Sequence, residues 1–333
     1  MVRPEELGPW CWAARHRLPA VRLDLEALEA FAATLRAAPP PLPKWDHPAW
    51  PVEAGPALDA VVVLGNALNF SYWVPDGEAM WGWPAATARF VQKADSERVL
   101  SSDLARSESI LSDAFALFGR LTAALAAGVD LGDARVLQSS EITTLFDGGT
   151  GTQPLIPERI AFLQSIGRVL EARFGGHLRH ALAVPDALDF ATHLATVWPT
   201  AYEDAPLLEG QPVPLRKRAQ LAAGMLHAAR IAREVPGLER PERLTLYADY
   251  MLPRVLRALG ILVLAPGLAA TIDRGDEVPP DSPEEVALRI ATVAAGEGLV
   301  QATGIPAIAL DYALWRAGFG ITARHHRTRT TAY

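Results

Sequence analysis

Asp249 is the residue whose type and position most strongly suggest chemistry. It lies within an apolar run, LTLYADYMLPRVLRAL, at residues 244–259. If that run is a helix, Asp249 shares a face with Leu252 and Leu256, where a core side chain would be expected. An unpaired charge is costly to bury, and Pro253 would break the helix beside the acid. The pattern indicates a carboxylate at a helix break as a candidate reaction centre, with helix capping or an ion pair with an arginine as the alternative.

Two further charged side chains accompany helical patterns. Lys217, in the segment RKRAQL, would usually be explained as part of a solvated basic face. Asp311, in the segment LDYALW, falls on the apolar stripe formed by Ile308 and Trp315. Carboxylates so placed can accept hydrogen bonds from the N–H groups of a nucleobase. An internal ion pair is the alternative for Asp311.

A polar and aromatic cluster, NALNFSYW, occupies residues 66–73 and contains Asn69 and Phe70. Aromatic faces interleaved with amide and hydroxyl groups suit a flat heteroaromatic ring, because stacking holds its plane while the amide binds its edge. Core packing explains the same pattern.

Other motifs are weak. The glycine-rich DGGTGT at 147–152 matches neither the dinucleotide nor the P-loop pattern and is predicted to be a turn. His177 and His180 lack a third ligand at diagnostic spacing, so no metal site is predicted. The basic C-terminal segment with His325 and His326 is expected to be solvated.

Composition limits the class of protein. The 333 residues are 50% hydrophobic and 21% charged, which is typical of a folded protein with a substantial core. Cys11 is the only cysteine, so we expect a reducing, cytoplasmic setting. No signal peptide or spanning segment is apparent, and a soluble protein is expected. A net charge of −7 disfavours a nucleic-acid partner but leaves a single phosphate possible.

The patterns predict a mainly α fold with at most a small β element. Helical spacing dominates, no alternation supports a large sheet, and AVVVLGNAL at 60–68 is ambiguous between strand and helix. We expect a single large helical domain over 1–333, with 1–44 as an N-terminal helical extension packed on it. The predicted helices are 21–38, 107–127, 157–174, 186–198, 215–234, 244–260, 283–297 and 305–317.

Taken in order, LNFSYW, KRAQ, YADYMLP, LDYALW and HRTRTTAY resemble the queuosine salvage protein family. The resemblance runs from about residue 45 to the C-terminus; MWGWPAAT at 80–87 departs from the family's tyrosine-rich second aromatic block. Members of the family hydrolyse queuosine 5′-phosphate to queuine and ribose 5-phosphate. They are largely α-helical and similar in shape to helical DNA glycosylases, so the resemblance implies the same for this chain.

The resemblance also implies roles for individual residues. Asp249 would be the catalytic acid, with Lys217 and Asp311 in the pocket and His47 near the base. Cleavage of a ribosyl C–N bond builds positive charge on the sugar, which a carboxylate beneath C1′ would stabilise or attack. A neighbouring Lys217 would favour the ionised form of that carboxylate.

The leaving base is a 7-deazaguanine without the N7 lone pair, so negative charge must be stabilised from the pyrimidine side of the ring. Asp311 and Asn69 are the candidates for that side, with Phe70 or a tryptophan stacking on the ring. Lys217, Arg327 and Arg329 are candidates for the 5′-phosphate. No metal or organic cofactor, no direct contact with nucleic acid and no membrane are implied, and the sequence leaves the oligomeric state open. The alternatives are a non-catalytic nucleotide-binding or tRNA-binding module and a glycosylase that acts on nucleic acid.

Overall fold

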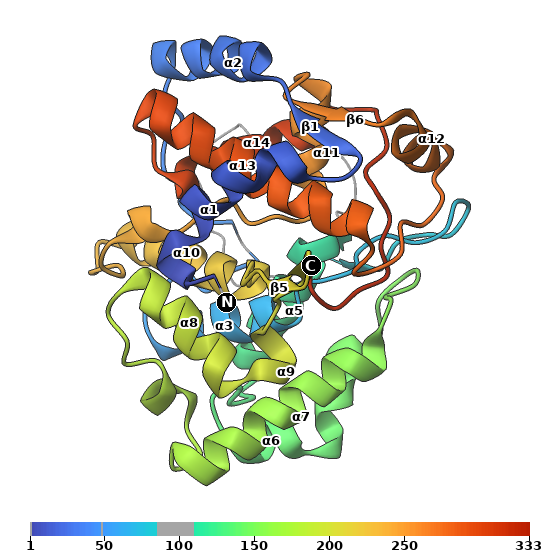
Figure 1. Cartoon of the computed structure of the whole chain (residues 1–333). Coiled ribbons are helices and arrows are strands. Elements are labelled where there is room, and N and C mark those ends of the chain that lie inside the picture. The colour runs from blue at the N-terminus through green and yellow to red at the C-terminus, as the bar shows by residue number, and fades with distance from the viewer. Residues whose placement is uncertain (1, 48, 85–109) are drawn as a thin grey trace. The chain divides into compact units, whose positions relative to one another are not determined.

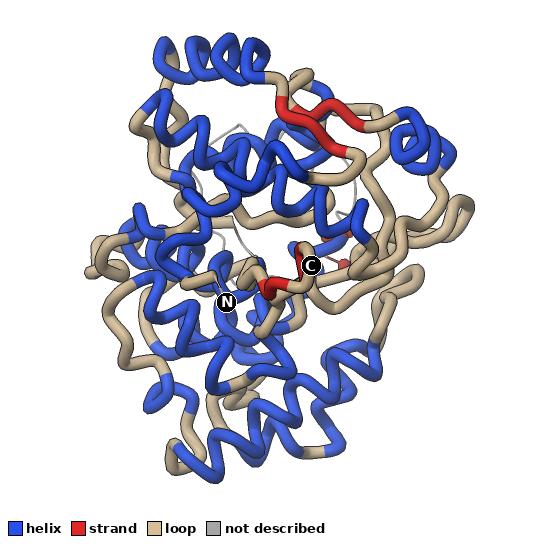
Figure 2. The backbone as a smooth tube through the Cα atoms, in the orientation of Figure 1, coloured by secondary structure: helices blue, strands red, loops and turns tan. Residues whose placement is uncertain are grey.

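The computed structural model describes residues 2–47, 49–84 and 110–333 (Figure 1). The chain divides into two compact units. Unit 1 comprises Met1–Pro43, Val184–Ala228 and Leu238–Tyr333, and unit 2 comprises Lys44–Ala183 and Ala229–Gly237. Most of the described backbone is helical, and the strands are short and pair in twos (Figure 2). The predicted mainly α fold is therefore confirmed.

Unit 1 packs around the long helix α13, Pro283–Thr303. This helix contacts α1 (Leu7–Ala14), α2 (Leu25–Ala37), α11 (Met251–Ala258) and α14 (Ala307–Gly318). The other elements of unit 1 are η1 (Pro4–Glu6), η2 (Arg15–Arg17), β1 (Val21–Leu23), α8 (Ala187–Val197), α9 (Pro199–Tyr202), β4 (Leu207–Leu208), β5 (Gln211–Pro212), α10 (Lys217–Ile231, whose last turn belongs to unit 2), η6 (Pro241–Arg243), β6 (Leu262–Leu264) and α12 (Pro266–Arg274).

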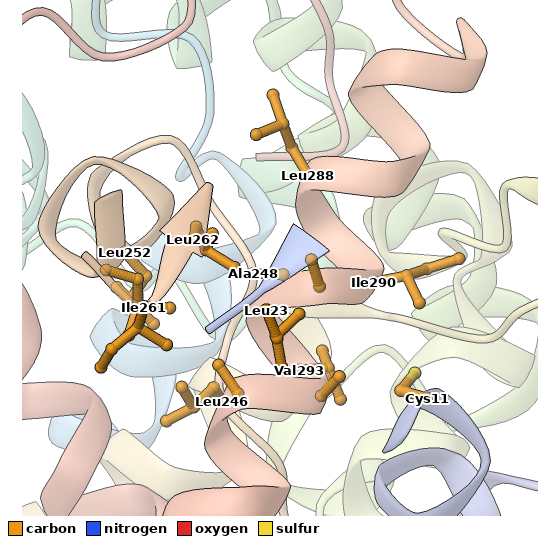
Figure 3. Close-up of a cluster of buried hydrophobic side chains, with 14 of the residues drawn as sticks. Cys11, Leu23, Leu246, Ala248, Leu252, Ile261, Leu262, Leu288, Ile290 and Val293 are labelled. Carbon is orange, nitrogen blue, oxygen red and sulfur yellow. The ribbon is translucent and has the colours of Figure 1, made fainter. Parts of the chain in front are cut away.

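The core of unit 1 joins α13 to segments far away in sequence. Leu288, Ile290 and Val293 of α13 lie in one buried hydrophobic cluster with Leu246 and Ala248 from the segment before α11 (Figure 3). Burial of such side chains stabilises each by roughly 1.5 to 3 kcal/mol. The cluster therefore fixes the segment that leads to Asp249 against the central helix.

Unit 2 is a second helical assembly. Helix α3 (Pro56–Ala67) packs on α5 (Asp113–Ala126) and α7 (Ile156–Arg173), and α6 (Ala134–Gln138) packs on α7. The apolar run that was ambiguous between strand and helix is helical, because its nine residues from Ala60 to Leu68 are all buried inside α3 and its C-cap. The other elements of unit 2 are β2 (Gly82–Pro84), β3 (Ile110–Ser112), η4 (Ser140–Phe146) and η5 (Leu178–Ala181).

Most predicted helices are confirmed with small shifts at their ends. Helices α7, α8, α10 and α14 lie within about three residues of their predicted ends. Helix α13 begins at Pro283 as predicted but continues past residue 297 to Thr303, and the Ser282 side chain caps it by accepting from the Glu285 N–H at 3.3 Å. The prediction over 21–38 was too long, because residues 21–23 form β1, which pairs antiparallel with β6. Over 107–127, α5 begins only at Asp113 after a strand, and residues 107–109 lie outside the described residues.

The N-terminal residues are an integral part of unit 1. Helix α1 packs along α13, and strand β1 pairs with β6, so residues 1–43 share the core of unit 1. The prediction of one domain over 1–333 stays a prediction.

Within the described residues, no single helix is both long and apolar enough to cross a membrane; only α13 and α14 together meet that criterion, and they are bent by 118°.

Candidate active site

The chain from Leu244 to Ala248 forms neither helix nor strand, and α11 begins only at Met251. The predicted helix over 244–260 was therefore wrong in its first half. Leu246 and Ala248 enter the core cluster, and Asp249 follows them directly, at the bend before α11.

Asp249 is half-buried and binds the start of α11. Its Oδ1 accepts hydrogen bonds from the backbone N–H groups of Met251 at 2.8 Å and Leu252 at 3.0 Å. Pro253 is then the third residue of the helix, where a missing N–H costs nothing. The capping alternative thus describes the local structure. Both hydrogen bonds that the described residues give Asp249 end at Oδ1, which leaves Oδ2 for a ligand.

Buried polar side chains from three helices hold this segment, which pairs with no strand among the described residues. Gln220 of α10 accepts from the Thr245 N–H at 2.9 Å, and Asp311 of α14 accepts from the Tyr247 N–H at 2.7 Å. Arg289 of α13 donates from Nε to the Ala248 carbonyl at 3.2 Å. Backbone groups that a sheet would otherwise satisfy are paired in this way, and the last of them immediately precedes Asp249.

Two glycines let helices approach the same segment closely. A Cβ on Gly224 of α10 would lie 1.9 Å from the Tyr247 hydroxyl oxygen. A Cβ on Gly296 of α13 would lie 2.3 Å from Leu246 Cγ. Neither separation is compatible with a side chain, so both helices need glycine where the segment crosses them.

Lys217 is the first residue of α10 and is only 4% exposed, so it is not on a solvated basic face. Burial lowers the pKa of its ammonium group, while the negative charges of Asp249 and Asp311 act to raise it. The described residues provide no hydrogen-bond partner for Nζ, so its donors remain for a ligand. The structure thus brings together three residues that sequence patterns singled out separately.

Asp311 is 6% exposed, and its Oδ2 is engaged by the Tyr247 N–H. Burial raises its pKa well above the ordinary value, and the Asp249 charge acts in the same direction. The Tyr247 hydrogen bond and Lys217 oppose that rise. Asp311 therefore retains a proton to higher pH than an exposed aspartate.

His325 belongs to this cluster, and the sequence patterns missed it. Its ring packs on Tyr250 with centroids 4.5 Å apart, and Nδ1 lies 2.7 Å from the His326 carbonyl oxygen. Nδ1 must therefore carry the proton, which makes Nε2 an acceptor. Burial lowers the pKa of His325, and Asp249 is among the charges that act on it. The sequence predicted a solvated tail because neighbouring arginines dominate its composition.

The C-terminal segment is anchored rather than solvated. His326 is 2% exposed, and its Nε2 lies 3.0 Å from the Tyr333 hydroxyl. Arg327 donates to the Gly275 carbonyl at 3.2 Å, and its charge acts on His325. Arg329 is exposed and lies 4.0 Å from Glu277. Of these two arginines, Arg327 is the one that the structure connects electrostatically with His325.

The remaining predicted residues belong to unit 2. Phe70 is fully buried, with the Arg159 guanidinium 4.2 Å from its ring centre and Phe162 at 5.6 Å, which favours core packing over stacking on a base. Asn69 is 8% exposed and donates to the Asn66 side chain at 3.2 Å.

His47, also in unit 2, packs edge-on against Phe115, and burial lowers its pKa to about 4. Its Nδ1 accepts the Ala49 N–H at 3.1 Å, so the imidazole is neutral near pH 7. Of the departing motif at 80–87, residues 85–87 lie outside the described residues.

Comparison with known proteins identifies the family. The model for the queuosine salvage protein family matches residues 55–333, so the chain belongs to that family. The queuosine 5′-phosphate N-glycosylase/hydrolase of Sphaerobacter thermophilus is 30% identical over 327 residues, covering 94% of this chain and 93% of that protein. The protein of the same name from Nematostella vectensis is 24% identical over 319 residues, covering 86% and 85%. That of Dictyostelium discoideum is 28% identical over 189 residues, covering 54% and 59%.

Proposed function

We propose that this protein hydrolyses the N-glycosidic bond of queuosine 5′-phosphate, with water as co-substrate and queuine and ribose 5-phosphate as products. The observation that carries the proposal is that Asp249, Lys217 and Asp311 lie close together in unit 1. The charges of the two aspartates influence the pKa of Lys217, and Asp249 and Lys217 influence the pKa of Asp311. The family and the names of the relatives support the same reaction. The released base would serve the salvage of queuine for tRNA modification in the cytoplasm.

Asp249 is the group proposed to face the sugar. One carboxylate oxygen is fixed by the N-terminus of α11, so the other is held in a defined orientation. Negative charge at that position stabilises the oxocarbenium-like state that forms as the C–N bond lengthens. The same oxygen can attack C1′ directly, or the positive charge can be stabilised while water adds.

Asp311 is proposed to bind the pyrimidine side of the leaving base. Its Oδ2 accepts the Tyr247 N–H, so a proton retained on the other oxygen can be donated to the base as negative charge develops there. This role suits a 7-deazaguanine, which has no N7 to protonate. The roles expected for Asn69 and His47 in unit 2 stay predictions, and the chemistry assigned to unit 1 does not depend on them.

The 5′-phosphate is proposed to bind Lys217 and Arg327. Lys217 has an ammonium group without a hydrogen-bond partner among the described residues. Arg327 lies close enough to the site for its charge to lower the pKa of His325. A phosphate beside a buried ammonium group gains a charge-assisted hydrogen bond that the free nucleoside lacks. Arg329 is a weaker candidate because it is exposed and lies near Glu277.

A chromatographic assay of queuine release tests the proposal. Equal concentrations of queuosine, queuosine 5′-phosphate and queuosine-containing tRNA are incubated with the protein. We expect release from the nucleotide, slower release from the nucleoside and none from intact tRNA. Binding of the nucleotide without release would favour a non-catalytic module, and release from tRNA alone would favour a glycosylase acting on nucleic acid.

A further inference from the structure

The segments that carry Asp249 and Lys217 are joined by one buried ion pair. Arg289 donates from both terminal nitrogens to Asp204, with Nη1 at 2.9 Å from Oδ1 and Nη2 bonded to Oδ2. The exposed fractions of the two side chains are 1% and 5%. Such a bidentate ion pair fixes the relative orientation of the two side chains as well as their distance.

Each partner has a further hydrogen bond that leads to a different proposed site residue. On one side, Arg289 Nε donates to the carbonyl of Ala248, the residue directly before Asp249, at 3.2 Å. On the other side, Asp204 Oδ2 accepts the backbone N–H of Lys217 at 3.3 Å. Hydrogen bonds thus connect the two site segments without interruption, from Ala248 through Arg289 and Asp204 to Lys217.

The surroundings of the pair keep it in one arrangement. The Tyr333 ring covers the guanidinium of Arg289 at 4.6 Å, and Glu285 lies 3.7 Å from Arg289 Nε. The Asp204 carbonyl also accepts from the Arg216 N–H at 2.9 Å. A buried ion pair is weak evidence for stability, because desolvation of both charges opposes their attraction. Its position between two site segments indicates another role.

We propose that Arg289 and Asp204 are positioning residues that set the separation and orientation of Asp249 and Lys217. The inference rests on the proposed function and assigns the pair no contact with substrate. The pair acts through backbone groups next to the two site residues. Since a misplacement of about 1 Å can reduce a rate about a hundredfold, loosening the pair should lower turnover more than it lowers substrate binding.

The test compares Arg289→Lys and Asp204→Asn with the wild-type protein in the queuine release assay. Arg289→Lys keeps the charge but loses the bidentate geometry, and Asp204→Asn keeps the shape and an acceptor for the Lys217 N–H. Each variant should lower kcat about tenfold to a hundredfold, with KM changed less than about threefold. Assays are run well below the lowest Tm, so that folded protein is compared.

Asp186→Asn is the matched control. Asp186 is another buried carboxylate of unit 1, paired with Arg240 at 2.7 Å and with Arg243, and it makes no hydrogen bond to Ala248 or Lys217 among the described residues. This variant should lower Tm by a similar amount and keep kcat within about twofold. Asp204→Asn is the milder change, so its kcat alone tests the positioning role if Arg289→Lys does not fold.

Three outcomes would overturn the inference. Unchanged kcat in folded Asp204→Asn shows that the pair does not position the site. An equal loss of kcat in Asp186→Asn shows that general destabilisation is the cause. If the wild-type protein releases no queuine from the nucleotide, the proposed function fails, and the positioning role fails with it.

Discussion

At the scale of the residue, environment gives Asp249, Lys217 and Asp311 different roles. Asp249 is half-buried with one oxygen bonded to a helix start, Lys217 is a buried cation, and Asp311 is a buried acid. Two carboxyl groups in unlike surroundings can act as stabilising anion and as proton donor in one reaction. The pH dependence of activity and stability should reveal this division.

Lys217 should set an alkaline limit on activity. Its protonated form is the one proposed to bind phosphate, and burial lowers its pKa below the usual 10.5. As pH rises through that lowered value, the cation is lost, so kcat/KM should fall before pH 10.5. Lys217→Gln should have a low kcat/KM that does not fall further over this alkaline range. Lys44→Gln, the same change at an exposed lysine, should show the same alkaline fall in kcat/KM as the wild type. A rate that increases across the same range would contradict the role.

Asp311 should make stability fall with rising pH. Its folded-state pKa is raised by burial, so its contribution to stability is complete below the unfolded value of 3.8 and is lost as pH rises through the folded value. Asp311→Asn still accepts the Tyr247 N–H, and its unfolding free energy relative to wild type should increase as pH rises above 3.8. Urea unfolding measures the difference.

Asp273→Asn provides a control of opposite sign. The hydrogen bond from Arg257 lowers the pKa of Asp273, so its charged form favours the folded state at neutral pH. Neutralising it should therefore lower stability slightly rather than raise it. Equal slopes for wild type and Asp311→Asn would contradict a buried, proton-retaining Asp311.

At the scale of the element, the non-helical segment before α11, residues 244–248, positions Asp249. Its backbone is tied by Gln220, Asp311 and Arg289, and its side chains fit against glycines of two helices. The segment therefore depends on shape as much as on hydrogen bonding.

Gly224→Ala should destabilise the protein, although alanine favours helices. The new Cβ would meet the Tyr247 hydroxyl at 1.9 Å, and such overpacking costs about 1 to 3 kcal/mol. Adding Tyr247→Phe removes the clashing oxygen, which is buried and has no hydrogen-bond partner among the described residues, so the double variant should recover much of the loss. Gly267→Ala in α12, where a Cβ meets nothing within 4 Å, is the control and should not destabilise. Equal Tm values for Gly224→Ala and Gly267→Ala would contradict a close contact between Gly224 and Tyr247.

Sequence patterns predicted the long helices because their apolar periodicity and ends are local features. The Ser282 side chain caps α13, and Pro157 lies in the first turn of α7. The segment before α11 was predicted wrongly, since its apolar residues fit a helical period even though LTLYAD also alternates. Tertiary contacts keep this segment from being helical, because side chains of α10, α13 and α14 form hydrogen bonds with its backbone groups.

The candidate site was predictable in its charged residues but not in its supports. Asp249 and Asp311 were found because a charge in an apolar pattern is conspicuous, whereas the pocket role of Lys217 was implied only by the family resemblance. Arg289 also lies in an apolar helical run, but only the fold shows that it bonds Asp204 and that the pair bonds both site segments. His325 was masked by its basic neighbours in the sequence, and its packing on Tyr250 depends on the C-terminal segment folding back.

At the scale of the whole molecule, two helical units each have their own buried polar anchor. In unit 1 it is the pair of Arg289 and Asp204, and in unit 2 it is Arg159. Arg159 is fully buried and donates to the carbonyls of Leu68, Phe70 and Pro154. It thereby holds the chain that follows α3.

Arg159→Gln should destabilise unit 2 strongly. Glutamine cannot reach three carbonyl groups, and hydrogen bonds to charged donors contribute about 1.5 to 3 kcal/mol each, so a loss of at least about 3 kcal/mol is expected. Arg168→Gln, on the exposed side of the same helix, should be nearly neutral. Comparison of the two by thermal unfolding checks the role; similar Tm values would contradict it.

The most direct test of the whole account is kcat for queuine release from queuosine 5′-phosphate by Asp249→Asn. Asparagine can still accept the Met251 and Leu252 N–H groups, so folding and ligand binding should be retained while kcat falls at least about a hundredfold. Asp24→Asn makes the same change at the cap of α2 and should leave kcat unaltered. Turnover by Asp249→Asn equal to that of Asp24→Asn would contradict the account.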